Sequence, residues 1–74
     1  MPYVNIKVTR ERSGPVTPEQ KAELIKGVTD LLVKTLNKNP KTTIVVIDEV
    51  DMDNWGIGGL PCEDYRALAA AQQK

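Results

Sequence analysis

The sequence predicts an α/β protein: a small βαβ unit, followed by a hairpin and a short C-terminal helix. Three stretches carry this prediction: an alternating segment at the start, a capped amphipathic segment after it, and a β-branched run in the middle. Strand, helix and strand in this order form a parallel pair with a right-handed crossover. With 74 residues, we expect one domain spanning 1–74.

The first strand is predicted in the stretch YVNIKVTR, where apolar and more polar residues alternate. Val4, Ile6 and Val8 fall on one face, and the residues between them fall on the other. A period of two is typical of a strand with one face on a core. The stretch RERSGPV that follows contains serine, glycine and proline, so it predicts a loop.

The helix is predicted to begin at the stretch TPEQ, where Thr17 can cap, Pro18 takes the first helical position and Gln20 closes a capping box. Apolar and small residues then recur at helical spacing. They are Ala22, Leu24, Ile25, Val28, Leu31, Leu32, Thr35 and Leu36. Pro40 stops the pattern, so we expect a helix over about residues 18–38.

The β-branched run TTIVVIDEV predicts a second, more deeply buried strand. One helix can cover only one face of the resulting sheet, which leaves the other face for a partner subunit. The stretch DMDNWGIGGLP predicts a tight turn or short hairpin, because it places three glycines close together. The stretch CEDYRALAAAQQK is rich in helix formers and predicts a short C-terminal helix.

The composition excludes several classes of function. Ten basic and ten acidic residues balance, which argues against a nucleic-acid-binding module. No apolar run reaches the ~20 residues of a membrane span and no signal-peptide pattern is present, so we expect a soluble, cytoplasmic protein. With one cysteine and no histidine, neither an intrachain disulfide nor a metal site is expected. A chain this small has a marginal core, which favours an oligomer.

Several motifs together resemble the 4-oxalocrotonate tautomerase family of the tautomerase superfamily. They are the MP start, the arginine-containing loop, the stretch EQKAELI, the strand end IDEV and the stretch WGIGG, covering residues 2 to about 60. The resemblance implies a tautomerase-like fold, assembly into dimers and then a homohexamer, no cofactor, and a small-molecule carboxylate as substrate. It also implies that the amino-terminal proline is the general base.

The chemistry explains why a proline would serve as the base. Methionine before a small residue is normally removed, which would leave Pro2 with a free secondary amine. An α-amine has a pKa of about 7.7–8.0, and an apolar pocket lowers it because burial disfavours the charged form. The alternative interpretation is that Pro2 merely suits the first position of a strand.

Three further residues are candidates for the site. Trp55 matches the aromatic residue that family members place beside the proline, where it would exclude water, lower the amine pKa and pack against a planar conjugated substrate. The alternative is a core tryptophan. Arg12 matches the family's carboxylate-binding arginine, and it would also steady developing enolate charge. The loop is longer than usual, so Arg10 stays a candidate; the alternative for both is a solvated loop arginine.

One position departs from the family pattern. Where well-known members carry a second arginine this chain has Ile44, and the nearby Lys38 and Lys41 are not equivalent to a buried arginine. This puts a dicarboxylate substrate in doubt. Cys62 is expected to be a small buried or interfacial residue.

The residues of the C-terminal helix and of the acidic run are interpreted as structural. Tyr65 and Arg66 are predicted to lie at assembly contacts, and the acidic run Asp48, Glu49, Asp51 and Asp53 is predicted to be a solvated strand end. The leading functional hypothesis is a cofactor-independent keto–enol tautomerase acting on small unsaturated 2-oxo acids. The alternatives are a proline-dependent hydratase, dehalogenase or decarboxylase, in which Asp51 or Asp53 could assist Pro2, and a non-catalytic assembly protein on the same scaffold.

Overall fold

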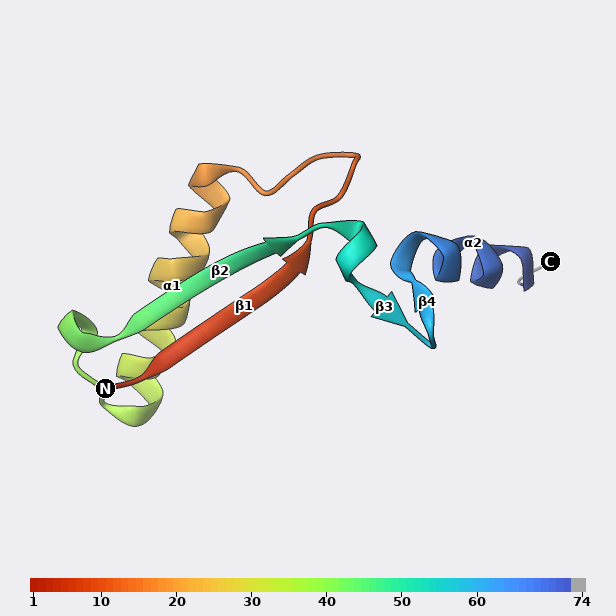
Figure 1. Ribbon diagram of the computed structural model, residues 1–74. Helices are drawn as coiled ribbons and strands as arrows, with labels where there is room; N and C mark the ends of the chain where they lie inside the picture. Colours follow the sequence, from red (N-terminus) through yellow and green to blue (C-terminus); the bar gives the residue numbers. More distant parts are fainter. Residues whose placement is uncertain (73–74) are drawn as a thin grey trace.

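Two parallel strands and one long helix form the first half of the molecule (Figure 1). The computed structural model describes residues 1–72. Strand β1 (Tyr3–Thr9) pairs in parallel with β2 (Ile44–Val50), in a register that sets Tyr3 opposite Ile44. Helix α1 (Pro18–Leu36) connects them and lies across one face of the pair. The predicted βαβ unit is confirmed.

Local sequence signals fix both ends of α1. The Thr17 hydroxyl accepts the Gln20 N–H at 3.1 Å, and the Gln20 side chain accepts the Thr17 N–H at 3.0 Å, so the predicted capping box is present. At the other end Asn37 takes a left-handed conformation with φ 57°. The helix therefore ends at Leu36 rather than near residue 38. A 3-10 turn, η1 (Pro40–Thr42), then leads into β2.

The second half extends away from the βαβ unit, as Figure 1 shows. A 3-10 turn, η2 (Met52–Asn54), leads into an antiparallel hairpin of β3 (Gly56–Ile57) and β4 (Leu60–Pro61). Gly58 and Gly59 form its turn with φ of 61° and 84°, which other residues rarely adopt. Helix α2 (Cys62–Gln72) follows directly. The predicted hairpin is confirmed, and so is the C-terminal helix as far as Gln72; positions 73–74 of the predicted stretch lie outside the described residues.

Few side chains are buried within one chain. Among residues 1–72 only Met52 and Cys62 count as buried, at 9% and 1% exposure, and both lie where η2 meets α2. The Cα radius of gyration is 16.3 Å, against about 11 Å for a compact chain of this length. The burial expected of Cys62 is confirmed. The described part of the chain is elongated, and its core consists of these two residues.

The prediction that the second strand is deeply buried is wrong for the isolated chain. No residue of β2 is buried, and Ile44 and Val46 are 41% and 36% exposed. The helix covers one face only, so side chains on the opposite face stay open. The apolar stripe of α1 is also incompletely covered, since Leu24 is 40% and Leu31 59% exposed.

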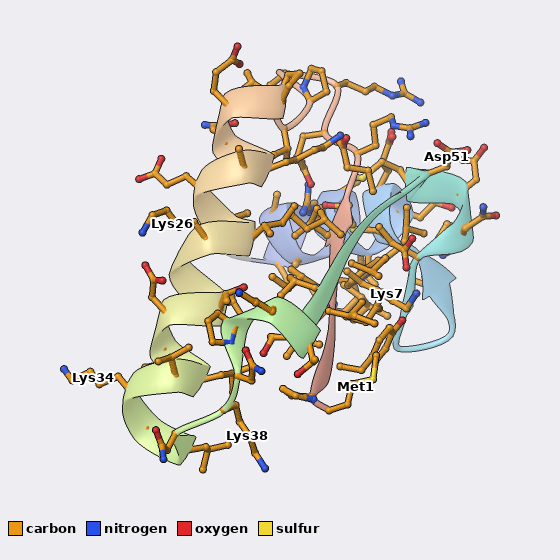
Figure 2. All side chains as sticks on the ribbon, turned by 90° about the vertical axis from the view of Figure 1, so that its left-hand side faces the viewer. Met1, Lys7, Lys26, Lys34, Lys38 and Asp51 are labelled. Carbon is orange, nitrogen blue, oxygen red and sulfur yellow. The ribbon has the colours of Figure 1, made fainter. Side chains whose placement is uncertain are left out.

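The two faces of the sheet differ in chemistry. On the open face, Asp48 accepts hydrogen bonds from Asn5 and Lys7, each at 2.9 Å. Lys7 extends away from α1, whereas Lys26 and Lys34 lie on the outer side of that helix (Figure 2). The ammonium group of Lys7 is the main cause that lowers the pKa of Asp48. The open face thus carries a polar cluster beside exposed apolar side chains.

On the helix-covered face, Glu49 ties the start of α1 to the sheet. Its side chain is 7% exposed, lies 2.7 Å from the Lys21 ammonium and accepts the Val16 N–H at 3.1 Å. Lys21 is the main cause that lowers the pKa of Glu49. The predicted solvated strand end is therefore wrong for Glu49, which the helix start covers, whereas the Asp48 side chain is 45% exposed.

The small size of the core predicts that stability depends on association. Because burial of the open sheet face needs a partner, the urea midpoint of unfolding should rise with protein concentration. Circular dichroism over about a hundredfold range of concentration, with sedimentation equilibrium, measures this. A well-folded monomer with a constant midpoint would contradict the expectation.

Glu49 should make stability depend on pH. Its folded-state pKa is lowered, so its stabilising contribution is fully present above the unfolded value of about 4.3 and is lost as pH falls through the folded value. Glu49→Gln should therefore lower the free energy of unfolding at neutral pH, and the deficit should shrink on acidification. Urea unfolding at one protein concentration measures both. Glu23→Gln, on an exposed position of α1, is the control and should change little.

Candidate active site

A charged cavity forms where the strands end. Because β1 and β2 are parallel, the loop after β1 and the turn after β2 meet at one edge of the sheet. They line a cavity of about 380 Å³ that is open to solvent. Its lining residues are Arg10, Glu11, Arg12, Pro15, Asp51, Met52 and Asp53. Both candidate arginines therefore lie at the same cavity.

Three consecutive residues of the loop, the charged triplet Arg10, Glu11 and Arg12, each face an opposite charge from the C-terminal part of the chain. Arg10 Nη1 lies 2.9 Å from Asp51 Oδ1. Arg66 Nη1 donates to Glu11 Oε1 at 2.9 Å. The nearest atoms of Arg12 and Glu63 are Nε and Oε1, 3.1 Å apart. These ion pairs hold the loop against η2 and the first turns of α2.

The electrostatics of Glu11 follow from these contacts. Its bonds from Arg66 and from the Thr9 hydroxyl hold the pKa of this carboxyl below its ordinary value, with Arg66 the larger cause. The same contact raises the pKa of Arg66. Glu11 therefore stays ionised and paired. Arg66, which the sequence placed at an assembly contact, has a partner within its own chain.

Arg10 and Arg12 differ in which guanidinium nitrogens remain free to bind a substrate. A terminal nitrogen of Arg10 donates to Asp51 at 2.9 Å. Arg12 approaches Glu63 through Nε, and its terminal nitrogens donate no hydrogen bond within residues 1–72. Its side chain is 81% exposed. Arg12 thus presents an open terminal fork, the edge that binds a carboxylate through two parallel hydrogen bonds.

Pro2 lies at the opposite end of the molecule. It immediately precedes β1, and its carbonyl accepts the Ile44 N–H at 3.0 Å. At ~3.3 Å per residue the length of β1 separates it from Arg10 by roughly 25 Å. Figure 1 shows the N-terminus at one end of β1 and the charged loop at the other. A single chain does not bring Pro2 and the arginines together.

The other candidates divide between the same two ends. Trp55 follows η2, whose first residues line the cavity; its N–H donates to the Met52 carbonyl at 3.2 Å, and its carbonyl accepts the Cys62 N–H at 2.7 Å. Ile44 lies beside Pro2, and Figure 2 shows Met1 and Lys38 at this same end. The proline end therefore has Ile44 as an apolar neighbour, and the far end holds the candidate arginines.

Sequence reasoning missed the contact between Glu63 and Arg12. The alternation of charge in the triplet was visible, but its partners lie about 50 residues away and only the fold selects them. Within residues 1–72, no three His, Cys, Asp or Glu side chains are placed to hold a metal ion. Neither helix of that part of the chain is long and apolar enough to cross a membrane.

The family model described as Tautomerase enzyme matches residues 2–65, which is most of the chain. The chain therefore belongs to this family, as the motifs predicted. The match begins at Pro2 and includes both arginines, Trp55 and Glu63.

Individual relatives agree with this assignment. Probable tautomerase K2 of Dickeya dadantii is 57% identical over 70 residues, covering 95% of this chain and all of that protein. A probable tautomerase of Helicobacter pylori is 58% identical over 59 residues, covering 80% of this chain and 85% of that protein.

Solved structures share the fold. The crystal structure of DmpI from Helicobacter pylori superposes with a TM-score of 0.78 at 52% identity, covering 89% of this chain and 97% of the other. A 4-oxalocrotonate tautomerase isozyme from Methylibium petroleiphilum gives 0.69 at 31% identity, covering 84% and 94%. The small α/β architecture is thus that of the tautomerase fold.

Proposed function

We propose that this protein is a cofactor-independent keto–enol tautomerase acting on small unsaturated 2-oxo acids, with the amine of Pro2 as general base. The observation that carries the proposal is the family match, which begins at Pro2, at the head of β1. With Met1 attached, the nitrogen of Pro2 is a tertiary amide without a basic lone pair. Removal of Met1 turns it into a secondary amine.

The surroundings of Pro2 suit a base. The hydrogen bond from Ile44 anchors the residue at the strand start, and the pyrrolidine ring limits its rotation. The apolar side chain of Ile44 lies nearby, and a partner subunit over the open sheet face would dehydrate this end further. Dehydration disfavours the ammonium form and lowers the amine pKa toward neutrality.

The proposed reaction moves one proton. The neutral amine takes the hydroxyl proton of a 2-hydroxydienoate, and the oxygen electron pair forms the carbonyl. The conjugated system then takes the proton back at carbon, which restores the free amine. No redox partner is needed. An arginine fork on the substrate carboxylate would hold the planar molecule in place and steady the enolate charge.

The geometry requires a neighbouring subunit for this arrangement. Arg12 and Pro2 of one chain are separated by about the length of β1, far beyond the reach of a small substrate. We therefore propose a homo-oligomer in which the charged cavity of one subunit meets the proline end of another, and the resemblance makes a hexamer the expected form. The exposed sheet face and helix stripe would be covered in the same assembly.

One observation supports an alternative reaction. Asp51 and Asp53 line the same cavity as Arg12, so a Pro2 docked there from a neighbour would lie close to carboxylates. A carboxylate favours the protonated amine, which acts as an acid. The alternative function is therefore a proline-dependent hydration, dehalogenation or decarboxylation.

The ionisation of Pro2 should appear in the rate. The pH profile of kcat/KM for ketonisation of a 2-hydroxydienoate should rise through a pKa below the ~7.7–8.0 of an ordinary α-amine. Protein that retains Met1, verified by mass spectrometry, should lose nearly all activity. Equal turnover by processed and unprocessed protein would rule out Pro2 as the base. A rate that falls with rising pH would favour the acid role.

Arg12 should matter more than Arg10 for binding. Arg12→Ala should raise KM and lower kcat/KM. The corresponding loss of transition-state stabilisation should be about 1.5–3 kcal/mol, the usual value of a charge-assisted hydrogen bond. Arg10→Ala should cost much less, because Asp51 already occupies its terminal nitrogen. Lys34→Ala, on the outer side of α1, is the control. The reverse order of effects would identify Arg10 as the carboxylate-binding residue.

A further inference from the structure

We infer that Glu63 is a positioning residue for Arg12: it holds the guanidinium by its Nε side, so that the terminal fork faces the substrate carboxylate. The inference rests on the proposed function, in that it concerns the same carboxylate site. It would also make helix α2 part of that site, although no residue of α2 lines the cavity.

The Glu63 carboxylate is held in an unusual way. The Glu63 side chain is 40% exposed, but its Oε1 is buried and accepts no hydrogen bond within residues 1–72, while Arg12 Nε lies 3.1 Å away. A buried carboxylate oxygen without a donor is costly unless a cation faces it. Arg12 supplies that cation. The two side chains therefore constrain each other, although Arg12 itself is mostly exposed.

The constraint acts from a helix on a loop. Glu63 is the second residue of α2 and follows Cys62, which is 1% exposed and whose N–H is bonded to the Trp55 carbonyl at 2.7 Å. Arg12 lies on the loop between β1 and α1, with a long side chain that loses rotamer entropy when it binds. Fixing its Nε side beforehand reduces the cost of binding a carboxylate.

Arg66 also helps to keep the Arg12 fork free, through its contact with Glu11. Its two terminal nitrogens contact Glu11, at 2.9 and 3.4 Å, and so neutralise the carboxylate that directly precedes Arg12 in the chain. Without Arg66, Glu11 would compete with the substrate for the Arg12 fork. The first two turns of α2 thus hold Arg12 through Glu63 and remove its rival through Arg66.

The decisive variant is Glu63→Ala, assayed by ketonisation of a 2-hydroxydienoate. We expect KM to rise roughly fivefold, the upper range for an exposed ion pair, with kcat within about twofold of the parent value. Glu63→Gln keeps the shape and loses the charge, so it should fall between them. Asp64→Ala is the matched control, because it removes an exposed acid from the next position of α2. A KM that falls in Glu63→Ala would overturn the inference, since it would mean that Glu63 competes with substrate.

A double variant separates positioning from general damage. If Glu63 acts through Arg12, Glu63→Ala should add nothing to the KM of an Arg12→Ala background. An additional rise there would show that Glu63 supports the site by another route and would overturn the inference. Sedimentation and thermal unfolding of every variant show whether a loss of activity comes from misassembly. If Glu63→Ala fails to assemble, the KM of Glu63→Gln alone decides.

Binding of an unreactive acid tests the inference apart from the proposed function. Sorbate is an unsaturated monocarboxylate without the 2-hydroxyl group, and calorimetry on the processed oligomer measures its Kd. Weaker binding in Glu63→Ala but not in Asp64→Ala would support the inference even if no tautomerase activity is found. Activity in the parent protein with unchanged KM and Kd in Glu63→Ala would leave the proposed function standing and overturn this inference. Absence of both activity and sorbate binding would overturn both.

Discussion

The shortage of apolar cover over a two-stranded sheet is the constraint on which the rest of the structure depends. One 19-residue helix lies on one face of β1 and β2, and Leu24 and Leu31 of that helix are themselves exposed. Apolar surface stabilises the fold by about 25 cal/mol per Å² when it is buried, and surface left in water contributes nothing. With only Met52 and Cys62 buried among residues 1–72, a single chain is therefore an incomplete folding unit. Association would supply the missing burial.

Parallel pairing of β1 and β2 also determines how far apart the candidate site residues lie. Both strands start at the proline end and finish at the charged cavity, so a base at a strand start and a binding loop at a strand end lie a strand's length apart. Covering the open surface with a second subunit would remove both deficits at once. In this interpretation folding stability and catalysis depend on the same subunit contacts, so loss of those contacts would weaken both.

The sequence predicted those features that depend on neighbouring residues. Thr17 and Gln20 specify the helix start within one turn, and Gly58 and Gly59 specify the hairpin through their own φ values. It could not predict the partners of Glu49 and Glu63. Lys21 is 28 residues from Glu49 in the chain, and only the packing of α1 on β2 brings them together. The separation of Pro2 from Arg12 follows from the direction of the strands, which the sequence pattern predicted. That the proposed site would then need residues from two subunits did not follow from the pattern.

The charges around the cavity decide what a neighbouring Pro2 would do there. Asp51 is paired with Arg10 and Glu11 with Arg66, whereas Asp53 has no ion pair within residues 1–72. A free carboxylate beside the amine would raise its pKa and favour an acid, and a neutralised one would leave dehydration to lower it and favour a base. The ion pairs of the charged triplet therefore do more than hold the loop. By setting how many carboxylates stay uncompensated, they would determine which of the two proton-transfer roles Pro2 can take at neutral pH.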